Sequence, residues 1–131
     1  MVGIVLVSHS QRLAEGLKDL LDQLAQGKAP VEAAGGTEDG SLGTDAVRIQ
    51  QAVERADQGD GVLILMDLGS AVLSARTALE FLEPDLAKRT ILGEGPLVEG
   101  AVAAAVEASA GSSLEEVRRV AEEASGYRKL D

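Results

Sequence analysis

Short, almost wholly apolar runs alternate with amphipathic segments along this chain, and this alternation constrains its fold more than any other feature. The runs at residues 3–7, 31–34 and 61–66 consist mainly of aliphatic and β-branched side chains. Runs of this length and composition are typical of strands that are buried on both faces of a parallel sheet. A fourth, weaker strand is expected over Arg89 to Leu92.

The segments between these runs have the periodicity of amphipathic helices. Five leucines between residues 13 and 24 recur at spacings of three and four, which predicts a first helix over Gln11 to Gln26. Further helices are expected over Thr44 to Ala56, Ala71 to Leu82, Leu97 to Ala110 and Ser113 to about Ala124. Thr44 and Ser70 are the expected N-caps of the second and third helices, and Ser113 with Glu116 resembles a capping box.

The element order β-α-β-α-β-α-β-α-α predicts an α/β fold, with one mostly parallel sheet of about four strands and helices on both of its faces. We expect residues 1–131 to form one domain, because a chain of this length can bury a single core. If the first strand is central, with the second and third strands on either side, ligands bind in the crevice between strands one and three. Those two strands end in His9 and Asp67.

His9 is the single histidine of the chain, and it lies between a strand and a helix start. A neighbouring carboxylate accepts one ring N–H, which fixes the tautomer and leaves the other nitrogen free to attack. We therefore predict that His9 is a nucleophile and that Asp67 orients its ring. For Asp67 alone, a helix cap or a solvated strand end remains an alternative.

Residues that suit an anion surround this predicted crevice. Free amides at a helix start attract phosphate, glycines let backbone amides approach an anion closely, and hydroxyls add donors. The predicted phosphate-binding residues are Ser10, Gly36, Thr37, Gly69 and Ser70. A phosphoryl group in flight needs positioning and charge stabilisation, which such donors supply.

Composition excludes several classes of function. The net charge of −10 and the presence of only two aromatic residues oppose nucleic-acid binding. The absence of cysteine removes thiol nucleophiles and thiolate metal sites, and one histidine cannot form a histidine-rich metal centre, so we expect neither metal nor cofactor. No signal peptide or membrane-spanning run is recognised, which predicts a cytoplasmic protein.

Several motifs of known chemistry are missing. The sequence contains no phosphate loop of nucleotide hydrolases, no G-x-G-x-x-G dinucleotide turn and no G-x-S-x-G nucleophile elbow. A Ser-His-Asp hydrolase built from Ser70, His9 and Asp67 remains an alternative, although Ser70 is not on a nucleophile elbow.

Five linked motifs carry a family resemblance. They are residues 4–10 (IVLVSHS), 35–40 (GGTEDG), 43–44 (GT), 67–71 (DLGSA) and 98–101 (VEGA). In this order they resemble the DhaM family, the phosphocarrier subunits of phosphotransferase-dependent dihydroxyacetone kinases. That family is similar in fold to the mannose-type IIA domains of the sugar phosphotransferase system, whose phosphorylated histidine follows the first strand, as His9 does.

The resemblance implies a phosphotransferase component that works through phosphohistidine. His9 would accept a phosphoryl group from the carrier protein HPr, here a separate protein, and pass it to ADP on the nucleotide-binding kinase subunit. A homodimer is also implied. Leu68-Gly-Ser-Ala71 stands where sugar-transport domains have a longer Gly-Gly-Ser-Pro segment, which favours the kinase branch. Two alternatives remain: a IIA component that passes phosphate to a IIB domain, and a non-catalytic domain that binds an anion or partner.

Overall fold

The structure, a computed structural model, describes residues 1–130. One parallel sheet contains β1 (Gly3–Ser8), β2 (Val31–Gly35), β3 (Val62–Met66) and β4 (Thr90–Leu92). Its strand order is β2-β1-β3-β4, and all neighbouring pairs are parallel. The predicted α/β fold, with the first strand between the second and third, is therefore confirmed.

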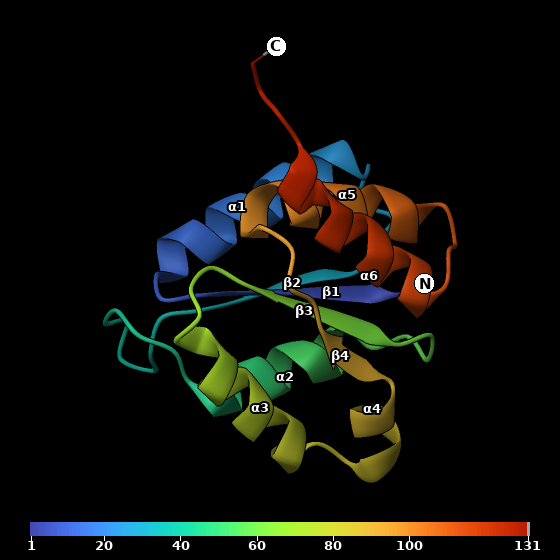
Figure 1. Cartoon of the computed structure of the whole chain (residues 1–131). Helices are drawn as coiled ribbons and strands as arrows, with labels where there is room; N and C mark the ends of the chain where they lie inside the picture. Colours follow the sequence, from blue (N-terminus) through green and yellow to red (C-terminus); the bar gives the residue numbers. More distant parts are fainter. Residues whose placement is uncertain (131) are drawn as a thin grey trace.

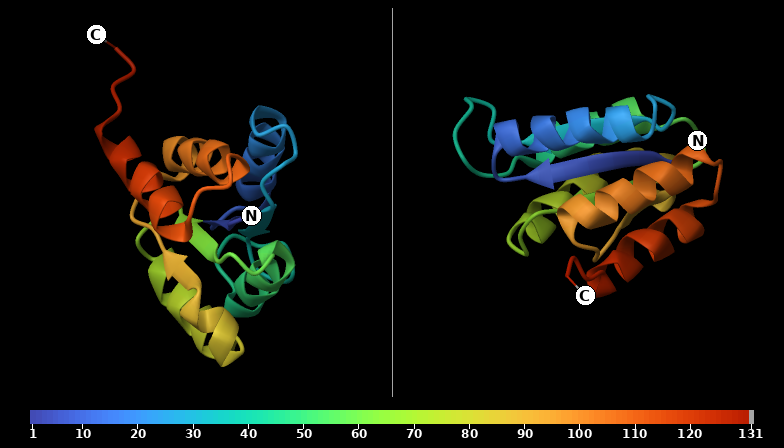
Figure 2. Two further views of the ribbon diagram at one scale, coloured as in Figure 1. Left: turned by 90° about the vertical axis from the view of Figure 1, so that its right-hand side faces the viewer. Right: turned by 90° about the horizontal axis from the view of Figure 1, so that it is seen from above.

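Helices cover both faces of the sheet (Figures 1 and 2). One layer contains α1 (Gln11–Leu24), α5 (Leu97–Ser109) and α6 (Leu114–Glu123), after which a short 3-10 turn covers Ala124–Gly126. The other layer contains α2 (Ala46–Ala56), α3 (Ala71–Phe81) and α4 (Pro84–Lys88). Among residues 1–130, no helix combines the length and apolarity needed to cross a membrane.

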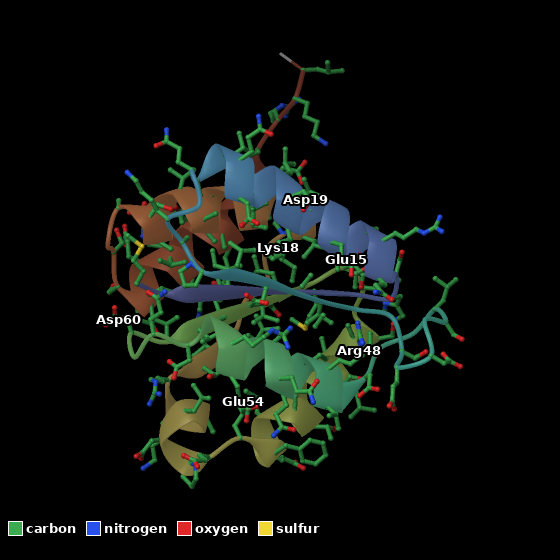
Figure 3. The ribbon with its side chains drawn as sticks, turned by 180° about the vertical axis from the view of Figure 1, so that it is seen from behind. Glu15, Lys18, Asp19, Arg48, Glu54 and Asp60 are labelled. Carbon is green, nitrogen blue, oxygen red and sulfur yellow. The ribbon has the colours of Figure 1, made fainter. Side chains whose placement is uncertain are left out.

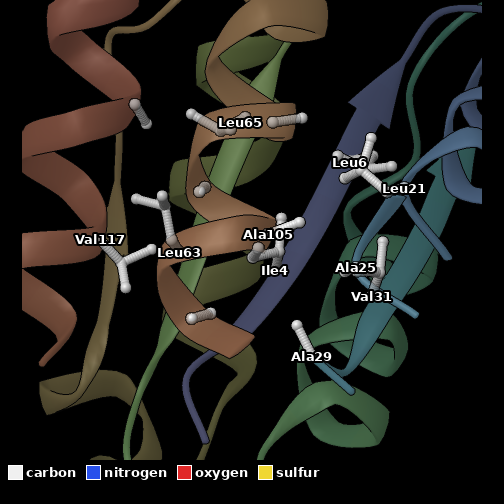
Figure 4. Packing of buried hydrophobic residues seen from close by; sticks show 14 of the residues in the cluster. Ile4, Leu6, Leu21, Ala25, Ala29, Val31, Leu63, Leu65, Ala105 and Val117 are labelled. Atoms are coloured by element: carbon white, nitrogen blue, oxygen red, sulfur yellow. The ribbon is translucent and has the colours of Figure 1, made fainter. Parts of the chain in front are cut away.

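The continuous apolar runs are explained by two separate cores. Ile4 and Leu6 of β1 face the α1, α5 and α6 layer, where they pack with Leu21 (Figure 4). Val5 and Val7 point the opposite way, into the core beneath α2 and α3. Because successive strand residues alternate between faces, a strand covered on both sides is apolar at every position.

The apolar stripe of α1 is wider than the core requires. Leu17 and Leu21 are buried, whereas Leu13, Leu20 and Leu24 are 46%, 45% and 50% exposed. Charged side chains lie on the outer surfaces of α1 and α2, as the labelled residues in Figure 3 show. The outer surface of α1 therefore mixes charge with exposed leucine side chains.

Several predicted boundaries and caps are wrong. Helix α1 ends at Leu24, because the following turn places Gln26 and Gly27 at positive φ. The N-cap of α2 is Asp45, whose carboxylate accepts hydrogen bonds from two amides of the first turn. The hydroxyl of Thr44 lies 2.7 Å from that of Ser74 instead.

Three further differences concern the second half of the chain. Ser70 precedes α3 but makes no side-chain cap bond. The five-residue helix α4 is a further difference, because Pro84 at its first position starts this helix, whereas the sequence pattern predicts only that Pro84 ends the preceding one. Ser113 caps α6 by accepting from the Glu116 amide, whereas the Glu116 carboxylate pairs with Arg119, so only half of the capping box forms.

Candidate functional site

His9 and Asp67 lie side by side where β1 and β3 end. Val7 and Met66 are partners in the sheet register, and the Asp67 amide donates to the Val7 carbonyl over 3.0 Å. This edge is on the left in Figure 1, where α1 and α3 begin. The ring of His9 is 28% exposed and the carboxylate of Asp67 is 15% exposed. The crevice predicted between the first and third strands thus brings these two residues together.

The Asp67 carboxylate is held by four donors. Its Oδ2 accepts from the Ser8 hydroxyl at 2.9 Å and from the His9 amide at 3.0 Å. Its Oδ1 accepts from the Leu68 amide at 2.7 Å and lies 3.0 Å from Nδ1 of His9. A carboxylate has about four lone-pair sites, so these contacts saturate it.

These contacts set the charge of Asp67 and the tautomer of His9. Burial alone raises the pKa of the Asp67 carboxyl, but the hydrogen bonds from His9, Ser8 and Leu68 outweigh it and hold the pKa below its ordinary value. An ionised carboxylate only accepts hydrogen bonds, so Nδ1 of His9 must carry the proton that it donates. The lone pair of the neutral ring is therefore on Nε2.

The free nitrogen of His9 contacts Ser70. Its Nε2 lies 2.9 Å from the Ser70 hydroxyl, which donates because Nε2 holds a lone pair. The contact explains why Ser70 does not cap α3: its hydroxyl is directed to the ring. Ser70 directly precedes α3, and His9 is two residues before α1. The positive ends of two helices therefore lie next to the ring, and both favour an anion there.

Ser10 and Gly36 lie beside the start of α1. The Ser10 hydroxyl caps the helix by accepting from the Leu13 amide at 3.2 Å, and the Ser10 amide donates to the Ser8 hydroxyl. Gly36 has a φ of +71°, and a Cβ there would lie 3.4 Å from the Gln11 amide nitrogen. Its own amide donates to the Ser8 carbonyl. These contacts place both predicted residues near His9, but their donors also serve the backbone.

Thr37 is placed differently from the other predicted phosphate ligands. Its hydroxyl donates to the Asp39 carboxylate over 2.7 Å, which lowers the pKa of Asp39 to about 2. Glu38, Asp39 and Asp45 surround it, so the loop is strongly acidic. Within residues 1–130, no hydrogen bond joins Thr37 to His9. The structure does not bring Thr37 into direct contact with the ring.

Open space adjoins the carboxylate side of the site. A depression of about 450 Å³ is lined by the loop after β3 and by the turn before α5, including Asp67, Gly69 and Gly95. In the part of the chain that is described, no three histidine, aspartate or glutamate side chains gather as metal ligands would. The chemistry available here is that of an oriented imidazole beside anion-binding groups.

Sequence reasoning missed the part played by Ser8. This residue is fully buried, and its hydroxyl links the Ser10 amide to the Asp67 carboxylate. The one local signal is a polar residue that ends an otherwise apolar strand. Its partner is 59 residues away, so spacing along the chain does not reveal it.

Comparison with known proteins gives a consistent family. Residues 3–118 match the EIIA-man family, described as the PTS system fructose IIA component. The phosphoryl donor subunit DhaM of the PEP-dependent dihydroxyacetone kinase of Providencia stuartii is 43% identical over 95% of this chain, but the chain spans only 27% of that protein. A DhaM subunit of Listeria innocua is 41% identical, over 89% of this chain and 94% of its own length.

Solved structures agree with the fold. A crystal structure of a protein of unknown function has a TM-score of 0.84 and 38% identity, and the match covers 99% of this chain and 98% of the other. The phosphotransferase component EIIA from Streptococcus agalactiae has a TM-score of 0.70 over 100% of this chain and 97% of the other; at 17% identity it supports the fold alone. By its family match and its relatives, the chain belongs to the EIIA-man family and, within it, to the group of DhaM subunits.

Proposed function

We propose that residues 1–131 form one phosphocarrier domain in which Nε2 of His9 accepts a phosphoryl group and passes it on. One observation carries this proposal: Nδ1 of His9 is engaged by Asp67, which leaves Nε2 as the nucleophile beside two helix starts. A general base would need no anion-binding surroundings, whereas a phosphorylated nitrogen needs them.

The transfer requires little covalent chemistry from the protein. The lone pair of Nε2 attacks the phosphorus of a phosphorylated donor nitrogen, a new N–P bond forms, and the donor N–P bond breaks with its electron pair returning to the donor ring. The positive charge that develops on the His9 ring is balanced by the Asp67 carboxylate. Nδ1 keeps its proton and continues to donate it to Asp67. For the attack to occur, the Ser70 hydroxyl must first turn from Nε2 to an oxygen of the incoming phosphoryl group. Ser10, Gly36, Thr37 and Gly69 are the further phosphate-binding residues that we propose.

The names of the relatives suggest a dihydroxyacetone kinase as the partner of this chain. Because they are phosphoryl donor subunits of PEP-dependent dihydroxyacetone kinases, we propose that phosphorylated HPr is the donor and that ADP on the nucleotide-binding kinase subunit is the acceptor. In the second step an oxygen of the terminal ADP phosphate attacks the phosphoryl group and the His9 N–P bond breaks. Phosphoenolpyruvate and ADP are cytoplasmic metabolites, so the proposed role places the protein in the cytoplasm.

A second candidate is a IIA component that passes phosphate to a IIB domain of a sugar permease. It is favoured by the description of the matching family as a PTS system fructose IIA component. Both candidates use the same phosphohistidine and differ only in the acceptor. The third, a non-catalytic regulatory domain, would bind an anion or partner in the crevice without exchange.

One experiment separates these candidates. The protein is incubated with phosphoenolpyruvate, enzyme I and HPr, and then mixed with either the ADP-loaded kinase subunit or a IIB domain. We expect an acid-labile, base-stable phosphoprotein, no labelling of His9→Ala, and ATP formation on the kinase subunit. Transfer only to IIB would favour the second candidate, and binding without labelling the third. Full labelling of a folded His9→Ala protein would refute both phosphocarrier candidates.

We further propose that the protein is a homodimer that uses the outer surface of α1 and α5. These two helices are neighbours in one layer, and Leu20, Leu24, Val98 and Val106 on them are each about half exposed. Exposed apolar side chains gathered on adjacent helices are typical of a surface that another molecule covers. Analytical ultracentrifugation tests the proposal: wild type should sediment as a dimer and Leu20→Lys with Val106→Lys as a monomer.

A further inference from the structure

Ser8 and Thr90 are the two fully or nearly fully buried polar side chains in the described part of the chain, 0% and 4% exposed. Their hydroxyls have very different partners. Thr90 donates to the Leu86 carbonyl four residues earlier, a local contact that only satisfies the hydroxyl. Ser8 instead donates to the carboxylate of Asp67, which is 59 residues away and directly follows β3.

Within the described residues, the hydroxyl proton of Ser8 has a single acceptor. The hydroxyl oxygen accepts from the Ser10 amide at 3.0 Å, so its single proton is free for another partner. The residue is buried from water, and the one acceptor recorded for this proton is Oδ2 of Asp67. A buried donor that lost this acceptor would be costly, so the contact is strongly favoured.

Oδ2 of Asp67 therefore receives donors from two consecutive residues, the Ser8 hydroxyl and the His9 amide. The terminal torsion of an aspartate is broad, so packing alone does not fix the plane of its carboxylate. The Ser8 hydroxyl and the His9 amide hold Oδ2, the Leu68 amide holds Oδ1, and together they fix that plane with Oδ1 3.0 Å from Nδ1 of His9.

We propose that Ser8 is a positioning residue for phosphoryl transfer: its hydroxyl holds the Asp67 carboxylate in the orientation that keeps the proton of His9 on Nδ1 and the lone pair on Nε2. This inference rests on the proposed function, in which Nε2 is the nucleophile. Ser8 touches no substrate and acts through Asp67. The same hydroxyl accepts from the Ser10 amide, so one buried group fixes both the ring and the start of α1.

The test compares Ser8→Ala, Ser8→Thr and the matched buried-hydroxyl control Thr90→Val. We expect Ser8→Ala to accept phosphate from phosphorylated HPr about tenfold more slowly, less than for loss of the carboxylate itself, because Ser8 is one of four donors to Asp67 and acts on the ring only through it. Ser8→Thr restores the hydroxyl and most of the rate, and Thr90→Val changes the rate by less than about twofold, because its hydroxyl bonds only to a helix carbonyl.

A spectroscopic measurement distinguishes a positioning role of Ser8 from a role in fold stability alone. The single histidine can be labelled with ¹⁵N, and its two ring shifts report the tautomer of the unphosphorylated protein without any transfer assay. Ser8→Ala should lose part of the Nδ1–H tautomer, and Thr90→Val should keep it. If Ser8→Ala fails to fold, Ser8→Cys replaces it, since a thiol fills the position of the hydroxyl but donates weakly.

A folded Ser8→Ala protein with the wild-type tautomer and the wild-type rate would overturn the inference. An equal loss of transfer rate in Ser8→Ala and Thr90→Val, at equal stability of the two variants, would also overturn the inference. Failure of the proposed function would give a different result from failure of this inference. In that case the wild type would not be phosphorylated, or His9→Ala would be phosphorylated as well.

Discussion

The substitution Asp67→Asn tests the side chain that accepts the most hydrogen bonds in the site. Four donors point at the carboxylate, and an amide can accept with one oxygen only. If its NH₂ group faces His9, the ring must accept at Nδ1, which moves the proton to Nε2 and removes the nucleophile. If its oxygen faces His9, the tautomer is kept, but the negative charge that balances the ring is lost.

Either orientation raises the barrier to transfer. A hydrogen bond to a charged group contributes about 2–3 kcal/mol, which corresponds to a rate roughly 30- to 150-fold lower. We expect the free energy of unfolding to fall by about 2–4 kcal/mol, within the 5–15 kcal/mol typical of small domains, so Asp67→Asn should still fold. A time course of ³²P transfer from phosphorylated HPr, with a denaturant melt, measures both quantities.

Asp57→Asn is the matched control. Asp57 is also a partly buried carboxylate, and its pKa is lowered chiefly by the hydrogen bond from Arg89, 2.6 Å away, but it lies outside the site. Its replacement should destabilise the fold and leave the transfer rate unchanged. A wild-type rate in Asp67→Asn, or an equal slowing in Asp57→Asn, would refute the reasoning.

The pH dependence of stability follows from the same carboxylate. Hydrogen bonds keep the pKa of Asp67 in the folded protein below its ordinary value of 3.8. The ionised carboxylate therefore stabilises the fold fully above its unfolded pKa, and this contribution is lost as the pH falls through the lower folded-state pKa. The difference in unfolding free energy between wild type and Asp67→Asn should be constant near neutral pH and shrink below about pH 4. A difference that grows toward acid pH would contradict this assignment.

Four further substitutions test other contacts. Ser70→Ala removes the hydroxyl 2.9 Å from Nε2, and we expect the phosphorylated protein to hydrolyse faster and form about tenfold more slowly, as followed by ³²P retention. Asp45→Ala removes the N-cap of α2 and should cost about 1 kcal/mol in a denaturant melt without changing the site, whereas Thr44→Val should cost less. Gly95→Ala places a Cβ against the Ala121 carbonyl oxygen, so the free energy of unfolding should fall by on the order of 2 kcal/mol and the melting temperature by several degrees.

The architecture was predictable because its strands are buried on both faces. A continuous apolar run at Ile4 to Val7 has few other interpretations, and the alternation with helices fixes a parallel sheet. Helix α4 was not predictable in the same way, because five residues show no periodicity and Pro84 starts a helix as readily as it follows one. Thr44 and Asp45 are adjacent and both suit a cap, so composition alone could not choose between them.

The part of the site that lies at the ends of β1 and β3 was predictable. His9 and Asp67 follow strands that are neighbours in the sheet, so topology alone brings them together. Ser70 was expected both to cap a helix and to bind phosphate, and the tertiary contact with His9 excludes the first role in this structure. Thr37 follows a glycine pair that suits an anion, but Glu38 and Asp39 follow it directly in the sequence, and the folded loop adds Asp45. The role of Ser8 depends on its contact with Asp67, which is distant in the sequence, so no local sequence pattern indicates it.

The most direct test of the central claim is ¹⁵N and ³¹P NMR of the phosphorylated protein. Since the chain has one histidine, each ring nitrogen gives one resolved signal. The geometry predicts phosphorus coupled to Nε2, with the proton retained on Nδ1 beside Asp67. Phosphorus on Nδ1, or a stable phosphoserine at Ser70 with an unmodified ring, would contradict it.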